Sequence, residues 1–297
     1  MRVLDEGVGV IEGRVNLGVV WRGDRAVMVD SGLDRDSARK ALRVLEGEGL
    51  QLVAVVNTHS HADHFGGNSY LVGRTGAEVW APRLEAAIIQ NPLLEPIYLF
   101  HGANPVKALR NRFVLAKPSP VHKVFDAGPL GLEGFGLEAV PLPGHSFNHT
   151  GIKVGDVLFC GDAVFSRRVV EKYKIPVVQD VGAHLKSLEK LCKMDVRLFV
   201  PSHAKPVRDI GSLARFNLGT TERIAGDVLA LVEEPRTVEE VHSLLATRYG
   251  LDTQVAQQWF LLHTTFMAYL GYLEESGRVR IQLEGNQLKW VASQSAE

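Results

Sequence analysis

The 297-residue sequence predicts a mixed α/β protein that ends in a smaller, mainly helical part. Short runs rich in Val, Ile and Leu recur before Asp209, and turns separate them, as is typical of β-strands. Helical patterns lie between several of these runs, which indicates layers of helices packed on sheets. After Asp209 longer helical patterns follow one another. This change predicts an α/β domain of residues 1–210 and a C-terminal domain of residues 211–297.

The composition is that of a globular protein with a substantial core. Hydrophobic residues make up 45% of the chain and charged residues 23%, which excludes a disordered chain or a disulfide scaffold. The 33 Lys and Arg residues are balanced by 34 Asp and Glu residues, so no overall basic field attracts nucleic acid or an anionic membrane.

The cysteine content and the N-terminal sequence bear on the compartment. Cys160 and Cys192 are the only cysteines, as in proteins of a reducing compartment. The N-terminal sequence MRVLDEGVGV lacks the apolar run of a signal peptide. No stretch reaches the roughly 18 uninterrupted apolar residues of a membrane-spanning helix. We therefore expect a cytoplasmic protein without a membrane partner.

The predicted α/β domain begins with a β-meander over residues 8–30, which has turns at Glu12-Gly13 and Arg22-Gly23-Asp24. A polar helix follows near residues 34–48. The apolar strand 52–56 then leads directly into a polar loop that starts at Asn57. Further apolar runs predict strands at residues 78–80, 137–141, 152–154, 157–160 and 198–200.

Residues 83–125 interrupt this alternation with five prolines and no clean periodicity, which indicates an insertion near the functional site. Six Lys and Arg residues in this segment face only two Glu residues, and Arg167 and Arg168 add further positive charge later in the chain. If these basic side chains form a rim around the site, they favour a substrate with a carboxylate or phosphate group. The alternative is that they belong to an ordinary solvated surface and aid solubility.

The C-terminal domain reads as three helices and a hairpin. Helical patterns cover residues 212–233 and about 252–276, and Thr237 to Glu240 forms a capping box that opens a helix between them. Glu284-Gly285-Asn286 separates two short strands, so the pattern resembles a winged helix. Seven basic against eleven acidic residues after residue 211 give a net charge of −4, which argues against binding of duplex DNA. The helical module is expected to form a homodimer or to cover the site.

The segment from Thr58 to His64 concentrates three imidazoles and a carboxylate in six positions, which packing alone rarely requires. In an extended chain His59 and His61 point to the same side and can bind one metal ion. Asp63 and His64 point elsewhere if a helix begins there, and can bind a second ion. A single His-x-His pair usually lies on the surface and binds no metal, whereas this cluster directly follows a predicted buried strand.

Three more donors follow apolar strands further along the chain, at strand-to-loop junctions where catalytic residues tend to lie. They occur in Pro143-Gly144-His145, Cys160-Gly161-Asp162 and Val200-Pro201-Ser202-His203. Each alone would be an ordinary residue, but together they complete the ligands of a two-metal site.

This set of motifs resembles the metal-binding motif of the metallo-β-lactamase-fold hydrolase superfamily, and Asp30 in Val29-Asp30-Ser31-Gly32 is similar to another marker of that family. The resemblance covers roughly residues 1–210 and implies an αββα sandwich. It also implies that His59, His61 and His145 bind one metal ion, that Asp63, His64 and His203 bind the other, and that Asp162 bridges the two.

The donor set predicts the chemistry. Imidazole and carboxylate ligands suit two zinc ions, although Fe or Mn can occupy such mixed sites. Two ions about 3.5–4 Å apart can share a hydroxide nucleophile and polarise an acyl or phosphoryl oxygen. We therefore expect a binuclear hydrolase of a small ester or thioester, for which an anionic group is one option. Asp63 and Asp162 belong to its catalytic centre.

Several alternatives remain open from the sequence. Hydroxyacylglutathione hydrolases resemble this chain in their ligands but differ in the C-terminal pattern, and lactonases of the family carry a tyrosine where this chain has Phe165. A phosphodiesterase or small endoribonuclease is the second enzyme class. A metal-sensing or DNA-binding regulator is the alternative outside enzymes, and the acidic C-terminal domain argues against it.

Overall fold

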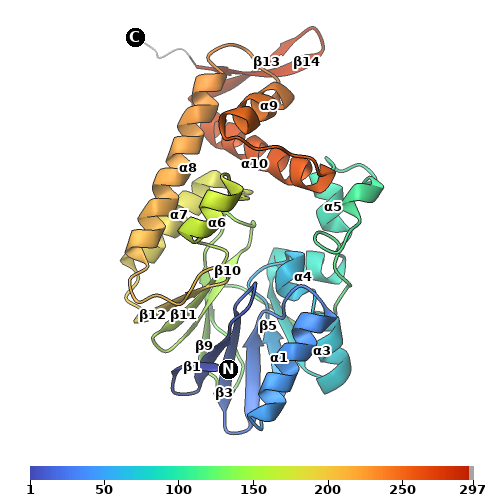
Figure 1. Ribbon diagram of the computed structural model, residues 1–297, viewed down its shortest axis with the longest axis vertical. Helices are drawn as coiled ribbons and strands as arrows, with labels where there is room; N and C mark the ends of the chain where they lie inside the picture. The colour runs from blue at the N-terminus through green and yellow to red at the C-terminus, as the bar shows by residue number, and fades with distance from the viewer. Residues whose placement is uncertain (294–297) are drawn as a thin grey trace.

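The computed structural model describes residues 1–293, and residues 294–297 of the predicted C-terminal domain lie outside the described part. Two β-sheets face each other, with helices against their outer faces (Figure 1). The first sheet has seven strands in sequence order, antiparallel up to β4 and parallel from β4 onward. Its strands are β1 (Arg2–Asp5), β2 (Val8–Ile11), β3 (Leu17–Arg22), β4 (Arg25–Val29), β5 (Gln51–Val56), β6 (Glu78–Pro82) and β7 (Lys123–Phe125).

The second sheet has five strands in the order β12-β11-β10-β9-β8, in which only β11 and β12 are parallel. Its strands are β8 (Gly128–Pro129), β9 (Leu137–Pro141), β10 (Thr150–Val154), β11 (Val157–Gly161) and β12 (Leu198–Pro201). The inward side chains of both sheets form one apolar core, to which Val20, Val27 and Val56 contribute from the first sheet and Ile152 and Phe159 from the second.

The helices complete a four-layer arrangement. Helix α1 (Arg35–Gly47) begins at Asp34, whose side chain accepts hydrogen bonds from the N–H groups of Asp36 and Ser37. Its buried stripe packs with α3 (Asn68–Thr75) on the outer face of the first sheet. Helix α7 (Val181–Lys193) and the first half of α8 (Gly211–Leu231) cover the second sheet. The expected αββα sandwich is confirmed.

The insertion between β6 and β7 is built of short helices, α4 (Arg83–Gln90), α5 (Leu94–Leu99) and the 3-10 turn η1 (Lys107–Leu109). Pro92 lies between α4 and α5, and a proline removes the backbone donor that a longer helix would need, which explains the missing periodicity. Leu99 and Leu109 of the insertion pack with Phe260 of the C-terminal part, so the two regions are in direct contact.

The C-terminal part consists of the second half of α8, α9 (Val238–Arg248), α10 (Ala256–Glu275) and the hairpin β13 (Val279–Glu284) and β14 (Gln287–Ala292). The capping box of Thr237 and Glu240 is confirmed. Helix α10 begins a few residues later than expected because Val255 has an extended backbone. The first half of α8 packs into the core of the α/β part, and its second half packs into the core of the C-terminal part. The domain boundary at residue 210 therefore stays a prediction, as does the likeness to a winged helix.

No helix within residues 1–293 is both long and apolar enough to cross a membrane. Two further helices are short, α2 (Ala62–Phe65) in the predicted ligand segment and α6 (Arg167–Tyr173) after β11.

Candidate metal centre

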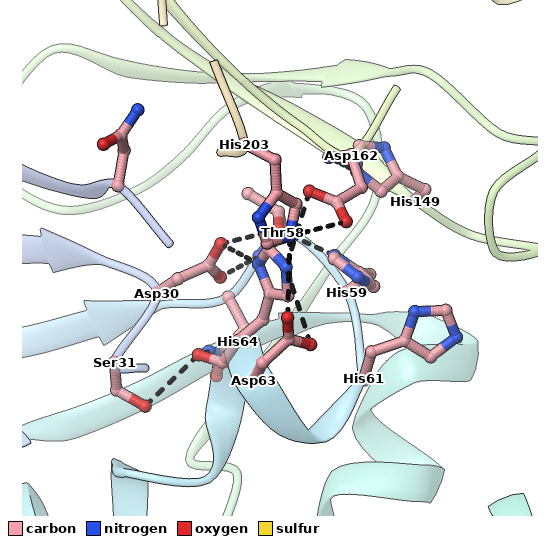
Figure 2. A network of polar contacts seen from close by, with 12 residues as sticks. Asp30, Ser31, Thr58, His59, His61, Asp63, His64, His149, Asp162 and His203 are labelled. Carbon is pink, nitrogen blue, oxygen red and sulfur yellow. Dashed lines mark hydrogen bonds and ion pairs between the residues drawn. The ribbon is translucent and has the colours of Figure 1, made fainter. Parts of the chain in front are cut away.

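The seven predicted ligand side chains lie together where strand ends of the two sheets meet, and Figure 2 shows most of them converging. Four of them follow β5 of the first sheet: His59, His61, Asp63 and His64. The second sheet contributes the other three, which follow β9, β11 and β12: His145, Asp162 and His203. The apolar strands thus end in polar side chains at one place between the sheets.

The donor atoms form three overlapping groups, and within each group they lie within 4.8 Å of one another. The groups are His59, His61 and His145; His59, His64 and Asp162; and Asp63, His64 and His203. The first and third groups match the two ligand sets expected from the resemblance. The second group shares members with both and contains Asp162.

The carboxylate of Asp162 lies between the two outer groups. Its Oδ2 atom is 3.6 Å from His145 Nε2 on one side and 3.2 Å from His203 Nε2 on the other. Its Oδ1 atom is 3.5 Å from His64 Nε2. The side chain is 7% exposed, so nearby histidines and not water surround it. This is the position that a bridging ligand requires.

Several buried donor atoms at the centre have no hydrogen-bond partner among the described residues: Nε2 of His59, His61 and His64, and Oδ1 of Asp162. A buried polar atom without a partner destabilises a protein by about 1–3 kcal/mol. Four such atoms in one place are suited to a cation, because a metal ion accepts lone pairs from imidazole and carboxylate alike. The donors present therefore fit bound metal.

Hydrogen bonds set the orientation of three of the imidazoles. His64 Nδ1 lies 2.8 Å from Oδ2 of Asp30, while His145 Nδ1 and His203 Nδ1 lie 2.8 and 2.9 Å from the carbonyl oxygens of Val177 and Arg14. Because these partners are acceptors, each Nδ1 carries the proton and donates it. When the ring is neutral, its Nε2 atom then carries the lone pair and faces the centre, as metal-ligating histidines require.

Asp30 joins the end of β4 to the ligand segment. Its carboxylate accepts hydrogen bonds from the backbone N–H and the hydroxyl of Thr58, both at 2.8 Å, in addition to its contact with His64 (Figure 2). Its backbone φ of +62° is in the left-handed region, where Asp is one of the residues that is tolerated. The marker noted in the sequence thus fixes the direction of a predicted ligand.

Glu85 of α4 was not singled out from the sequence, although it connects the ligand segments of both sheets. Its Oε2 accepts hydrogen bonds from the backbone N–H and the hydroxyl of Ser60, at 2.9 and 2.5 Å. Its Oε1 accepts from the hydroxyl of Ser146 at 2.7 Å and from the N–H of Asn148 at 3.0 Å. A single Glu in a helical pattern gives no signal of this role, which depends on its burial to 1% exposure.

The histidines of the centre fall into two groups by pKa: two are neutral, and two lie beside carboxylates that attract positive charge. Burial lowers the pKa of His145 to about 4 and the pKa of His59 well below its usual value, so both rings are neutral and each keeps one unprotonated nitrogen. The neighbouring carboxylate of Asp162 raises the pKa of His203 to about 10. Burial lowers the pKa of His64, but Asp162, Asp63 and Asp30 raise it by more. The carboxylates that raise the pKa values of His203 and His64 would also attract metal ions.

Two residues beside the bridging position support it. His149 Nε2 accepts a hydrogen bond of 2.9 Å from the backbone N–H of Asp162 and so holds the chain at this residue. Gly161 has φ +56°, and a Cβ atom there would lie 2.3 Å from His149 Nε2, so only glycine fits. Burial raises the pKa of the Cys160 thiol to about 12, consistent with a packing role.

Several aromatic and basic side chains of the insertion contact other parts of the described chain. The hydroxyl of Tyr98 accepts a hydrogen bond of 3.0 Å from Gln179, and the ring of Phe100 packs 5.4 Å from that of Phe260. Arg83 forms an ion pair with Asp126 on the surface. The basic rim and its preference for an anionic substrate therefore stay a prediction.

Comparison with known proteins identifies the class. The model of the metallo-beta-lactamase superfamily matches residues 10–203, and the chain belongs to this superfamily. Members of the superfamily are metal-dependent hydrolases, and the His and Asp cluster occupies the matched region.

Individual relatives are more distant. The lactamase-like protein adaB of Aspergillus niger is 25% identical over 240 residues, which are 80% of this chain and 64% of that protein. The hydroxyacylglutathione hydrolase of Albidiferax ferrireducens is 31% identical over 146 residues, 48% of this chain and 44% of that enzyme. The chain thus spans less than two thirds of the length of either relative.

Solved structures share the fold along nearly the whole chain. A metallo-beta-lactamase family protein from Thermus thermophilus has a TM-score of 0.75 at 21% identity and covers 98% of this chain and 100% of its own. A beta-lactamase domain protein from Burkholderia ambifaria also has a TM-score of 0.75, at 20% identity, and covers 98% of this chain and 93% of its own. The helical C-terminal part is therefore included in the shared fold.

Proposed function

We propose that the protein is a binuclear metal-dependent hydrolase that cleaves an ester or thioester bond in a small molecule. The observation that carries this proposal is the position of Asp162, whose Oδ2 lies within 3.6 Å of ligand nitrogens from both donor groups. A carboxylate in that position serves two ions at once. Imidazole and carboxylate donors make zinc our choice of metal, with Fe or Mn as the alternatives.

The side chains have distinct tasks in this proposal. His59, His61 and His145 bind one ion, and Asp63, His64 and His203 bind the other. Bound metal ions supply Lewis acidity for the acyl oxygen and activate water for attack. Asp63 is 39% exposed against 7% for Asp162, so Asp63 is the carboxylate that faces an incoming substrate. Asp30 and Glu85 keep the ligand loops in place without touching the substrate.

Similarity and a single residue support the acyl substrate. Hydroxyacylglutathione hydrolases are among the relatives at about 30% identity, which favours a thioester or ester over a phosphodiester. Phe165 lies with its ring 5.5 Å from that of His145 and has no hydroxyl to donate, so we rank lactones below open-chain esters. A cytoplasmic location and the absence of a nucleic-acid partner are part of the same proposal.

Metal analysis combined with substrate assays tests the proposal. We expect close to two transition-metal ions per purified chain, and hydrolysis of thioesters or esters that is lost on chelation and restored by metal. Asp162→Ala should lower both metal content and hydrolysis, whereas Asp156→Ala, an exposed carboxylate in the β10–β11 turn, should change neither. Full activity of the metal-stripped protein would disprove the mechanism. Cleavage of phosphodiesters but not of esters or thioesters would show that the protein is a phosphodiesterase and would contradict the proposed acyl substrate.

A further inference from the structure

The two-stranded C-terminal hairpin differs between its edges. It lies at the end of the molecule remote from the two large sheets (Figure 1). The outer edge of β14 is covered by the chain before α9: Trp290 and Arg236 exchange backbone hydrogen bonds of 2.7 and 3.0 Å, and Ala292 donates to Val232. One edge of the hairpin is therefore already paired.

The outer edge of β13 is open. Gly285 and Asn286 both have positive φ and form a two-residue turn, so Glu284 and Gln287 are a hydrogen-bonded pair. Because bonded pairs alternate along an antiparallel ladder, the N–H and C=O groups of Ile281 and Leu283 point away from β14. Within residues 1–293 these outward groups bond to no other segment.

The same strand exposes apolar side chains. Ile281 is 47% exposed, and Leu283, at 78%, is the most exposed large hydrophobic residue among those described. Leu283 pairs with Leu288, which is 45% exposed, so three apolar side chains lie on one face of the hairpin. An open edge with exposed apolar residues is a surface that natural proteins usually protect or use for pairing.

We propose that β13 pairs antiparallel with β13 of a second copy of this chain, about a two-fold axis at Gln282, and that the two hairpins form a four-stranded sheet. The order of side chains in β13 is complementary to itself in this register. Ile281 lies opposite the partner's Leu283, and both are apolar. Arg280 lies opposite the partner's Glu284. That carboxylate also contacts Lys289 of its own hairpin at 3.0 Å, so the facing Arg280 adds a second cation to it, once on each side of the axis.

The neighbouring registers are less favourable. A shift of the axis to Ile281 would place Arg280 opposite an uncharged glutamine and would use Val279, which is buried against the helices. It would also require Arg278 to pair with the partner's Glu284. Arg278 is already engaged, since its Nε donates to Ser276 Oγ at 3.0 Å and its guanidinium lies over the ring of Tyr272. A shift to Leu283 places Ile281 opposite glycine.

The interface is small, which sets the expected strength. One pair of six-residue strands buries less than the roughly 1,200 Å² of stable interfaces, so the dimer should dissociate on dilution. Sedimentation velocity over a concentration series of the purified, metal-loaded protein should show a monomer–dimer equilibrium. The result is independent of the proposed hydrolase function, because it measures mass and not activity.

Charge reversal tests the register. Arg280→Glu should shift the equilibrium to monomer, because it faces the partner's Glu284, and adding Glu284→Arg should restore the dimer. The matched control is Val3→Lys, because Val3 is 62% exposed on β1, the edge strand of the first sheet. It should leave the equilibrium unchanged. Circular dichroism of each variant confirms that it is folded.

Cross-linking gives a second, independent measurement. In a Cys192→Ser background, Gln282→Cys should form a disulfide dimer on oxidation, because the two sulfur atoms meet at the axis, where Cα atoms of such a pair are about 4.5 Å apart. Arg280→Cys should not, because the two positions 280 are four residues out of register. A monomer at every concentration, a dimer broken by Val3→Lys, or cross-linking at position 280 and not at 282 would each overturn the proposal.

Discussion

Glu85→Gln is the most informative single change. It replaces one carboxylate oxygen by an NH₂ group within a buried hydrogen-bond network and keeps the shape of the side chain. The Glu85 side chain accepts four hydrogen bonds, two from Ser60 and two from the segment 146–148. Ser60 lies between His59 and His61, and Ser146 follows His145. The substitution therefore acts on both loops that carry the first ligand group without touching a ligand.

The expected magnitude follows from the geometry. An amide has one oxygen, so its NH₂ group must face either the backbone N–H of Ser60 or that of Asn148. The serine hydroxyl on that side can rotate and accept, but the backbone donor is left unpaired, which destabilises by about 1–3 kcal/mol. The remaining bonds lose their ionic character. Together we expect the free energy of unfolding to fall by about 2–4 kcal/mol.

Two measurements check this expectation. Urea unfolding of the metal-free protein gives the change in stability, and metal titration gives the change in affinity, which should fall about 10- to 100-fold as for other outer-shell substitutions. Glu78→Gln is the control, because Glu78 is exposed and accepts one bond from the Trp80 indole, so its effect should stay below about 1 kcal/mol. Unchanged stability and unchanged metal affinity in Glu85→Gln would refute the reasoning.

Two further predictions concern pH and substrate charge. Burial, with a smaller effect of His263, lowers the pKa of His242 to about 4, so the native state binds fewer protons than the unfolded chain below pH ~6.5, and the free energy of unfolding should fall as pH drops from 6.5 to 4. His242→Gln should make this fall less steep in urea titrations, and an identical slope would contradict the assignment. If the basic rim steers substrate, an anionic ester should have a higher kcat/KM than a matched neutral ester at low salt only. Equal rates, or selectivity unchanged in the combined variant Arg110→Ala and Arg168→Ala, would leave the rim without this role.

The main features of the fold could be predicted from the sequence because each depends on local patterns. The stripe of Ala38, Ala41, Leu42 and Leu45 predicts a helix on a sheet, and the capping box at Thr237 marks a helix start. The insertion could not be resolved in this way. Its helices are shorter than the window over which periodicity is visible, and their stability comes from contacts with residues such as Phe260, which is distant in the chain.

The residues of the candidate site likewise differ in whether a local sequence pattern or only the folded chain reveals their role. The ligand residues were predictable, since His59 to His64 form a dense motif and the three remote donors follow apolar strands. Glu85 was not, because its role arises only when the loops after β5 and β9 approach the same helix. Asp30 lies between these cases: its motif was visible, but its hydrogen bonds to Thr58 and His64 required the folded chain.

The distribution of donors over the two sheets couples metal binding to the stability of the sandwich. Neither sheet alone completes a donor group, since His59 and His61 need His145 of the other sheet, and Asp63 and His64 need His203. Several buried donor atoms of this region have no partner among the described residues, which opposes the packing of the sheets. Bound ions would remove this unfavourable contribution. Metal that binds to the native state and not to the unfolded chain raises the free energy of unfolding, so with metal bound each sheet would stabilise the other through the shared donor groups.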